Sequence, residues 1–350
     1  HIYPDGGVAR LRVHGEVMPH ARWTGRRERP QLVDLAAAEH GGLVTSCNDM
    51  FFGSRHNLIM PGRGVHMGDG WETKRSRRPG PDWVVVRLGT EGAIERAIVD
   101  TLHFKGNAPD ACALCVTSCL EGDPDGSRDD GWRPLLPRTS LQPHTAHLFE
   151  HELLAAGQAT HVRLRIWPDG GVSRLRLLGV ASGAGRERSG MRYVRAMPEP
   201  ELEAALRACC GSTAWVRGMM EARRDGAFGE LAALKERAAL VWRSLSAADW
   251  DEAFRAHPKI GETKAAGPQG AVARAWSTNE QAKVAEATAA VLEELRDVNR
   301  AYEERFGRIY IVCATGKSAA EMLAIGKERM KNDPETELAR AADEQRKITE

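Results

Sequence analysis

The segment around His257 carries a side chain suited to acid–base chemistry. Pro258 biases His257 towards an extended conformation and so ends the helix predicted just before it. The imidazole would then project from a helix C-terminus, where the helix dipole favours the protonated form. Its ordinary pKa of about 6.5 suits proton delivery near neutral pH. A surface histidine that only terminates a helix explains the same local pattern, and that pattern alone favours it.

A second polar segment, STNEQ, opens the longest helical pattern of the chain. A helix N-terminus presents N–H donors, and beside them a hydroxyl, a carboxylate and an amide could bind one small polar ligand. Helix capping is the simpler interpretation, with Ser277 as the N-cap and Glu280 as the reciprocal residue. Taken alone, the segment favours capping.

The first half of the chain concentrates polar side chains in segments that are rich in glycine and aromatic residues. Long loops of this composition on a β scaffold are where binding and catalytic residues normally lie. Turn-forming side-chain hydrogen bonds explain any single one of them equally well. The candidates in these segments are Asp49, His56, Glu72, Arg75, Asp100 and His103.

The chain has seven cysteines, an odd number at uneven spacings. This argues against a disulfide framework and for a reducing cytoplasm. Cys112, Cys115 and Cys119 are spaced in a way that suggests a metal site, but no second Cys or His pair accompanies them. Their segment, 111–120, has the pattern of a buried apolar strand. We therefore expect these cysteines to lie in the core rather than to form a metal site.

The 350 residues include 49 Lys and Arg against 48 Asp and Glu, which gives a formal net charge of +1. A near-neutral chain has no overall attraction to nucleic acid or to an anionic membrane. No apolar stretch approaches the about 20 residues that cross a bilayer. The length predicts roughly two domains. We expect a soluble enzyme or binding protein that has neither nucleic acid nor a membrane as a partner.

Residues 17–185 have the pattern of a β-rich domain. Strand-like runs at 82–89, 93–104 and 111–120 are separated by Gly, Pro and Asn. Many short strands with turn signals are typical of a sandwich or jelly roll. Helical periodicity is confined to a short stretch at 32–38.

An internal repeat links the start of the chain to the end of this domain. Residues 2–15 (IYPDGGVARLRVHG) and 166–179 (IWPDGGVSRLRLLG) are identical at ten of fourteen positions, at an offset of 164 residues. Asp-Gly between two strand-like runs predicts a hairpin, and the long offset indicates a duplicated domain. We expect residues 1–16 to be the tail of a first unit and the chain to be a fragment at both ends.

The composition changes near residue 185. Small residues at 182–190 predict a flexible linker, and residues 186–350 then carry the periodicity of an all-α bundle. The apolar run at 309–313 interrupts this periodicity and should thread through the helical core. Capping-box patterns begin at Ser246, Ser277 and Ser318. Helices are predicted at 198–208, 231–245, 247–255, 279–305, 319–331 and 335–349.

Three motifs in order, HPKIGE, STNEQ and NRAYEERFGRIYIVCATGKSAAEML, make residues 193–350 resemble the OHCU decarboxylase family. OHCU is 2-oxo-4-hydroxy-4-carboxy-5-ureidoimidazoline, which the family converts to S-allantoin in purine catabolism. The resemblance implies an all-helical fold that uses no cofactor. It also implies that His257 and Glu280 are catalytic.

The same resemblance implies a set of substrate-binding residues. The side chains among them are Pro258, Ser277 and Gln281, and the backbone of the apolar run, including Ile309 and Ile311, lines the pocket. The family's late arginine usually follows a Lys-Ile pair. Here that pair is Lys347 and Ile348, and the arginine would lie beyond the last residue of the sequence.

The β-rich part, residues 1–185, resembles allantoicase, the ureohydrolase that converts allantoate to ureidoglycolate and urea. The motifs are NDMFFGSRHNLIMPGR, MGDGWETKR, DTLHFKGN and the repeated PDGGV segment. Allantoicases contain two jelly-roll repeats, so the resemblance implies that residues 17–185 are a complete second repeat. Hydrolysis of a ureido C–N bond requires an activated water and a proton donor for the departing nitrogen, and a substrate carboxylate calls for arginine. The six candidates above could supply these groups, and the cofactor requirement of this half is left unknown.

Together the two resemblances predict a multidomain, bifunctional enzyme of urate degradation whose partners are small ureido substrates, OHCU and allantoate. The alternative is that only the helical decarboxylase is active and that the β domain binds a ligand or mediates oligomerisation. The sequence leaves a homo-oligomer open, and it predicts a cytoplasmic protein.

Overall fold

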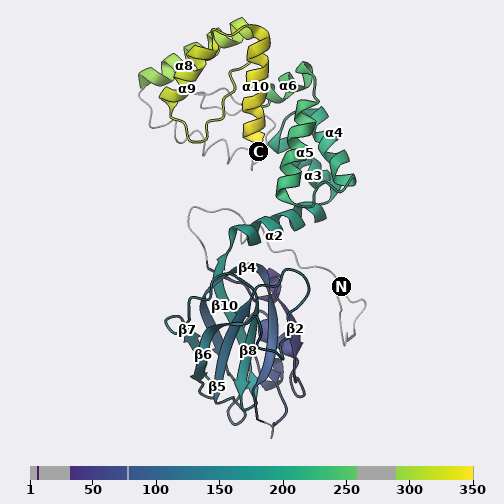
Figure 1. Ribbon diagram of the computed structural model, residues 1–350, viewed down its shortest axis with the longest axis vertical. Helices are drawn as coiled ribbons and strands as arrows, with labels where there is room; N and C mark the ends of the chain where they lie inside the picture. The colour runs from purple at the N-terminus through teal and green to yellow at the C-terminus, as the bar shows by residue number, and fades with distance from the viewer. Residues whose placement is uncertain (1–5, 8–31, 77–78, 258–288, 350) are drawn as a thin grey trace. The chain divides into compact units, whose positions relative to one another are not determined.

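The structure is a computed structural model that describes residues 6–7, 32–76, 79–257 and 289–349. Contacts between Cα atoms divide the chain into two compact units, His1–Tyr193 and Val194–Glu350. Strands are the main regular elements of the first unit, and helices are those of the second (Figure 1). The predicted fold class, a β-rich part followed by a helical part, is confirmed.

The first unit is built from antiparallel strands. They pair in the order β1-β10-β4-β8-β5-β6, with β2 and β7 also paired to β4, and β3 pairs with β9. The strands are β1 (Val33–Asp34), β2 (Leu43–Cys47), β3 (Trp71–Glu72), β4 (Asp82–Asp100), β5 (Ala111–Thr117), β6 (Arg133–Ser140), β7 (Ala146–Phe149), β8 (Ala159–Trp167), β9 (Gly171–Val172) and β10 (Arg174–Ala181). Three short 3-10 helices are η1 (Ala38–His40), η2 (Arg55–Ile59) and η3 (Met67–Asp69).

Strand β4 belongs to two layers. Residues 84–87 lie between β2 and β8, whereas residues 97–100 lie between β10 and β7. The partners change near Gly89 and Gly92, where an added Cβ would collide with the backbone carbonyls of neighbouring segments. The sequence predicts two strands here, ending at residue 104. The structure has one strand that bends between the layers and ends at Asp100.

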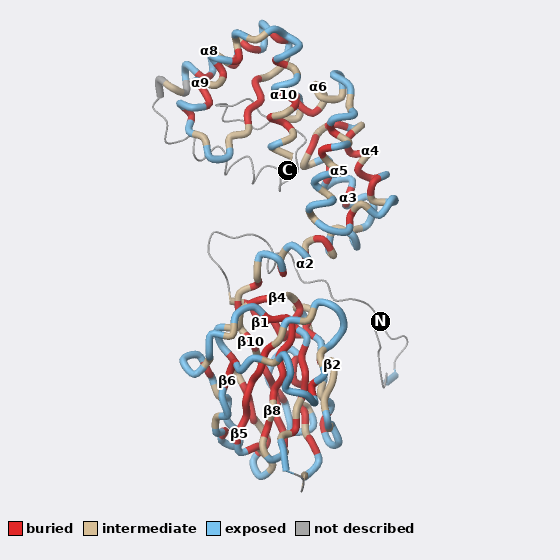
Figure 2. The backbone as a smooth tube through the Cα atoms, in the orientation of Figure 1, coloured by how far each residue is buried: buried red, intermediate tan, exposed pale blue. Residues whose placement is uncertain are grey.

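The two layers enclose one apolar core. Val84, Val86, Leu164 and Leu177 are fully buried members of the core, and they come from both layers. Strands β5 and β8 are buried along almost their whole length, so side chains on both of their faces are covered (Figure 2). A Cβ on Gly126 would collide with Trp83 and Val85, so a loop also covers the outer face of β4.

The second copy of the Pro-Asp-Gly-Gly segment, at 168–171, does not form the predicted hairpin. It joins β8 to β10, which pair with different halves of β4 rather than with each other. Its last glycine, Gly171, pairs with Glu72 of β3. Gly170 has a φ of 129°, and a Cβ on Gly171 would collide with the ring of Phe104. The two glycines allow the chain to cross closely from one layer to the other. The local sequence of such a crossing looks the same as that of a tight turn.

Two further predictions for this region are wrong. The stretch at 32–38 is not helical: it forms β1 and a turn, because Leu35 N donates to Leu177 O at 2.8 Å. The predicted linker lies almost entirely in a helix, α2 (Gly183–Ala196). Ser182 Oγ accepts from Gly185 N at 2.8 Å, and Arg188 pairs with Glu91 at 2.6 Å. These contacts hold the start of α2 despite its glycines.

The second unit is helical. Most predicted helices are confirmed in place, α4 was not predicted, and the start of the longest predicted helix lies outside the described residues. Capping boxes at Ser246 and Ser318 are confirmed, with bonds in both directions. No helix among those described combines the length and apolar composition that crossing a membrane would require. The helices are α3 (Glu199–Cys209), α4 (Thr213–Arg224), α5 (Leu231–Arg243), α6 (Ala247–Arg255), α8 (Ala289–Phe306), α9 (Ala319–Arg329) and α10 (Pro334–Thr349).

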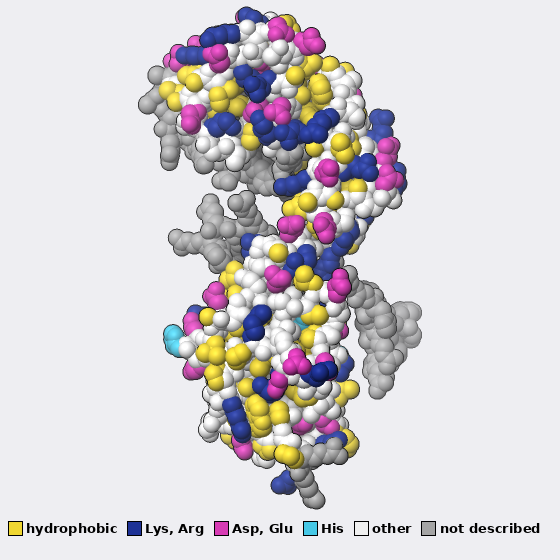
Figure 3. Space-filling view, viewed as in Figure 1, with side chains coloured by type: hydrophobic (Ala, Val, Ile, Leu, Met, Phe, Trp, Pro, Cys, Tyr) yellow, Lys and Arg dark blue, Asp and Glu magenta, His cyan; other side chains and the backbone are white. Residues whose placement is uncertain are grey.

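The apolar run at 309–313 passes through the helical core as predicted, although it forms no strand. Tyr310, Ile311 and Val312 are at most 5% exposed. Tyr310 packs with Tyr302 of α8, and both belong to one buried cluster. In both units, charged side chains of both signs are interspersed over the visible surface (Figure 3), as the near-zero net charge predicts.

Candidate functional site

Four connections meet at one end of the first unit: β2–β4, β4–β5, β6–β7 and β8–β10. Backbone hydrogen bonds join them, including Gly171 N to Asn107 O at 2.9 Å and Ser173 N to Asp100 O at 2.7 Å. The six predicted residues of this half lie on the first two connections or on the strand residues beside them. The fold therefore brings the three polar segments that contain these six residues to one end of the unit.

Glu72 is the best-oriented carboxylate in this region. It is half-buried on β3, and Asn107 Nδ2 donates to its Oε1 at 2.5 Å. Gly53 forms a backbone bridge with Glu72. An amide donor fixes one carboxylate oxygen and leaves the other available to a ligand or water. The motif DTLHFKGN contains Asn107, but sequence reasoning did not single it out.

His103 is the second oriented group. Its backbone has a φ of 74°, its N–H donates to His144 Nδ1 at 2.9 Å, and its Nε2 contacts Gly64 O at 3.0 Å. A carbonyl oxygen only accepts, so Nε2 carries a proton. In the neutral imidazole the lone pair is then on Nδ1. His144 lies far away in sequence, and no local motif marks it.

Asp49 and Asp100 have the structural roles that the turn interpretation predicts. Asp49 accepts from Lys74 N at 2.8 Å and Phe51 N at 3.1 Å. Burial raises the pKa of Asp49, but these bonds and the Lys74 ammonium outweigh it and hold the pKa below its usual value. Asp100 is buried and accepts from Leu102 N at 2.9 Å.

The last two candidates of this half, His56 and Arg75, have exposed side chains. Partial burial and the neighbouring Arg55 cation lower the pKa of His56. Arg75 extends from the β2–β4 connection, which also carries Glu72. Its guanidinium is therefore accessible to an anionic substrate.

The cysteines form no ligand set in the part of the chain that the structure describes. Cys112 and Cys115 are buried on β5, and all seven cysteines are free. Burial raises the pKa of Cys112 to about 12. No group of three or more His, Cys, Asp or Glu side chains suited to a metal is found among the described residues.

In the second unit, His257 lies in the turn after α6. Its backbone N–H donates to Phe254 O at 3.1 Å. Burial lowers the pKa of the imidazole, and an interaction with the side chain of Gln345 partly opposes this. The sequence predicts a protonated imidazole, whereas burial in the structure lowers its pKa and so favours the neutral form. Gln345 is fully buried on α10.

The structure describes only some of the other residues predicted for this unit. Glu280, Pro258, Ser277 and Gln281 lie outside the described residues. Ile309 is half-buried and Ile311 is buried in the apolar run. The structure therefore places His257 and the apolar run, and leaves the predicted pairing of His257 with Glu280 as a prediction.

Three buried side chains hold the backbone of the apolar run. Arg329 Nη1 donates to Ile311 O at 2.6 Å, and Arg329 pairs with Glu337 at 2.5 Å. Glu344 Oε2 accepts from Cys313 N at 2.8 Å. Burial and the bond to Glu337 raise the pKa of Tyr302, which donates to that carboxylate. Sequence reasoning missed this network, because its members are distant in sequence.

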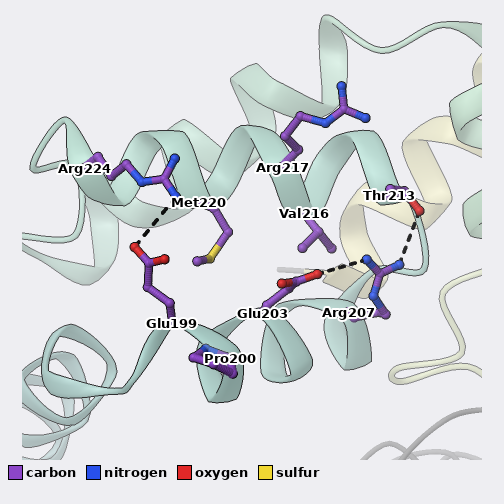
Figure 4. A pocket seen from close by; sticks show the side chains of 9 residues that line it. All are labelled: Glu199, Pro200, Glu203, Arg207, Thr213, Val216, Arg217, Met220 and Arg224. Carbon is purple, nitrogen blue, oxygen red and sulfur yellow. Dashed lines mark hydrogen bonds and ion pairs between the residues drawn. The ribbon is translucent and has the colours of Figure 1, made fainter.

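A surface pocket of about 400 Å³ lies between α3 and α4 (Figure 4). Four of its five charged side chains pair with one another: Arg224 with Glu199 at 3.7 Å and Arg207 with Glu203 at 3.4 Å. None of the predicted site residues lines it. The lining residues are Glu199, Pro200, Glu203, Arg207, Thr213, Val216, Arg217, Met220 and Arg224. It is therefore a groove between helices rather than the site predicted around His257.

Comparison with known proteins assigns a family to each unit. Residues 33–182 match the family model described as the allantoicase repeat. Residues 195–350 match the model for OHCU decarboxylase. A probable allantoicase of Pseudomonas syringae pv. tomato is 52% identical over 184 residues, which are 52% of this chain and 54% of that protein. The chain thus spans about half the length of the curated relatives it matches.

Solved structures give similar matches. Allantoicase from Saccharomyces cerevisiae is 40% identical, with a TM-score of 0.41, over 51% of this chain and 49% of that one. An OHCU decarboxylase solved in the presence of (S)-allantoin is 36% identical, with a TM-score of 0.34, over 42% of this chain and 92% of that one. The chain therefore carries a match to the allantoicase repeat family in its first unit and a match to the OHCU decarboxylase family in its second.

Proposed function

We propose that the chain is a bifunctional enzyme of urate degradation. The helical unit decarboxylates OHCU to S-allantoin, and the β unit hydrolyses allantoate to ureidoglycolate and urea. The observation that carries this proposal is the presence on one chain of two families whose reactions belong to one pathway.

For the decarboxylase, the chemistry centres on His257. When the C–CO₂ bond breaks, its electron pair passes into the ring and carbonyl system, and a proton must then be added to the ring. A neutral imidazole, which burial of His257 favours, accepts the proton of the substrate hydroxyl and then returns a proton to one face. Glu280 holds the ureido group or relays that proton. Acid–base assistance of this kind is worth about 10²–10⁴ in rate, and no cofactor is required.

The predicted substrate pocket needs a rigid wall, and the apolar run supplies one. Arg329 and Glu344 bond to its backbone at Ile311 O and Cys313 N. Ordered backbone groups beside a small ring acid hold it in a fixed orientation, and orientation supplies a large share of the rate of such reactions. Pro258, Ser277 and Gln281 complete the proposed binding set.

For the ureohydrolase, Glu72 and His103 are the groups best placed for acid–base work. Water adds to the carbon that bears two ureido groups, one C–N bond breaks, and the departing nitrogen takes up a proton. A base must activate the water, and Glu72 with its Asn107 donor and His103 with its Nδ1 lone pair are both suited to this. Arg75, exposed on the same connection as Glu72, is suited to bind the allantoate carboxylate.

The test uses the full chain. Freshly generated urate-oxidation products are added, and decay of OHCU and the chirality of allantoin are followed by absorbance and circular dichroism. Urea release from allantoate is measured separately, with and without added divalent metal. Decarboxylation together with urea release supports both halves. Decarboxylation without urea under any metal condition supports the alternative, a β unit that binds or oligomerises.

The proposal also covers the cellular location and the oligomeric state of the protein. We propose a cytoplasmic enzyme, because all seven cysteines are free. Homo-oligomerisation is proposed from a group of exposed apolar side chains on the β2–β4 connection, which includes Phe51 at 69% and Phe52 at 64% exposure. Light scattering of the full chain tests it.

A further inference from the structure

Two histidines in the first unit share an unusual backbone conformation. His103 has a φ of 74° and His144 a φ of 55°, and no other described residue except glycine has a positive φ. Residues other than glycine are uncommon in this region, although asparagine, aspartate and histidine adopt it more often than the rest, and such residues concentrate at functional sites. The two rings lie edge to face, with 5.9 Å between their centroids.

The two histidines hold each other in place. His103 N donates to His144 Nδ1 at 2.9 Å, and His144 N donates to Phe104 O at 2.9 Å. Thr101 joins the same two connections, since its hydroxyl donates to Gln142 O at 2.6 Å. The strained backbone at both histidines is therefore fixed by bonds between the β4–β5 and β6–β7 connections.

The acceptor of the His103 ring is also fixed. His103 Nε2 donates to Gly64 O at 3.0 Å. The loop that contains Gly64 is held by Arg174, which donates to Gly62 O at 3.3 Å and pairs with Asp69 at 2.9 Å. A fixed carbonyl selects the Nε2–H tautomer and leaves the Nδ1 lone pair of His103 for another partner.

We propose that His144 is a positioning residue, which holds His103 so that its Nδ1 acts as a base towards the ureido substrate. This inference rests on the proposed allantoate hydrolysis. His144 suits the role because its Nδ1 accepts from the His103 backbone while its own left-handed backbone brings the ring to that N–H. Without this bond, His103 would relax towards an ordinary backbone conformation and lose its bond to Gly64.

The test compares two substitutions in the full chain. His144→Gly removes the acceptor and tolerates the positive φ without strain. His144→Asn tolerates the same φ, and its Oδ1 takes the place of Nδ1 as acceptor. His151, an exposed histidine on another connection, provides the matched control as His151→Asn. The readouts are the ¹⁵N shifts of the His103 ring nitrogens, which report the tautomer, and kcat and KM for urea release.

The expected results differ between the variants. Wild type, His151→Asn and His144→Asn keep the Nε2–H tautomer of His103 and similar kcat values. His144→Gly mixes the two tautomers and lowers kcat by about 10²-fold, the scale of a misplaced catalytic group, with KM changed less than threefold. The shifts of His161, buried against Thr160 and Asp123, check that the unit is folded.

Two outcomes overturn the inference. One is an unchanged His103 tautomer in His144→Gly, and the other is loss of the tautomer in a folded His144→Asn variant. If His144→Gly does not fold, the His103 tautomer in His144→Asn alone tests the inference. If the wild-type chain releases no urea, the proposed hydrolysis fails, and the tautomer data still show whether His144 positions His103.

Discussion

His257 follows the last turn of α6, where the carbonyl groups of a helix end stabilise a cation, and yet burial lowers its pKa. The helix dipole acts through solvent and is worth about 0.3–1 kcal/mol at an exposed site. Loss of solvation can shift the pKa of a buried group by several units. A residue on a helix end can be recognised in the sequence, but its burial depends on α10, which begins far along the chain.

The pH dependence of stability follows from this shift. Because the folded-state pKa of His257 lies below the ordinary 6.5, the unfolded chain binds more protons as the pH falls below about 6.5. The stability that His257 contributes is complete above this pH and is lost as the pH falls towards the folded-state pKa. We expect His257→Gln to flatten this dependence, measured by calorimetry of the full chain between pH 7.5 and 5. Identical pH profiles for the two proteins would contradict it.

Substitution of His257 has a second expected effect, on catalysis. His257→Gln should slow OHCU decay by about 10²–10⁴-fold, the share of general acid–base assistance, while leaving the helical content unchanged. The rate is followed by absorbance and the fold by circular dichroism. A rate within threefold of wild type would remove His257 from the proposed mechanism.

At the scale of elements, the buried ion pair between Arg329 of α9 and Glu337 of α10 anchors the apolar run. Its side chains are 6% and 0% exposed. Glu337→Gln leaves the Arg329 cation unpaired, which should lower the free energy of unfolding by about 3–5 kcal/mol. The double change to Arg329→Met and Glu337→Leu should recover much of this loss, because it leaves no buried charge. Calorimetry of the full chain measures both.

A surface pair in the same unit is the control for this experiment. Lys327 and Glu294 are 2.6 Å apart, with side chains 51% and 54% exposed. Lys327→Met should cost under about 1 kcal/mol. If Glu337→Gln costs no more than this control, the buried pair does not anchor the run.

The crossing between β8 and β10 gives a test in the first unit. Gly171→Ala places a Cβ against the ring of Phe104, so we expect a loss of about 1–3 kcal/mol, as for other overpacked sites. Gly106→Ala is the matched control, because no atom lies within 4 Å of its added Cβ. Denaturant unfolding of both variants measures the difference. Equal stabilities would show that the crossing has room to relax.

Elements whose pattern is local could be predicted from the sequence. The apolar run predicted at 111–120 forms β5, because its composition alone indicates a buried strand. The crossing at Gly171 and helix α2 could not be predicted. In both places the conformation of the glycines depends on contacts with segments that are distant in the sequence. In the candidate sites, the motifs contain Glu72 and His103. Asn107 also lies in a motif, but its pairing with Glu72 and the role of His144 are found only when the connections are seen together.

At the scale of the whole molecule, each unit has its own core and its own candidate residues. We therefore expect His257→Gln to leave urea release within twofold of wild type, and His103→Gln to leave OHCU decay equally unaffected. Both assays are run on the same preparations of the full chain. A loss of both activities from either change would mean that the two reactions are coupled.

The bend of β4 has a consequence for how the first unit opens. One strand is hydrogen-bonded to β2 and β8 in its first half and to β10 and β7 in its second. Because one continuous strand belongs to both layers, we expect the two layers to open as one unit. In deuterated water, amide protons at Val86 and Val99 should exchange together, at the rate of the slowest global opening.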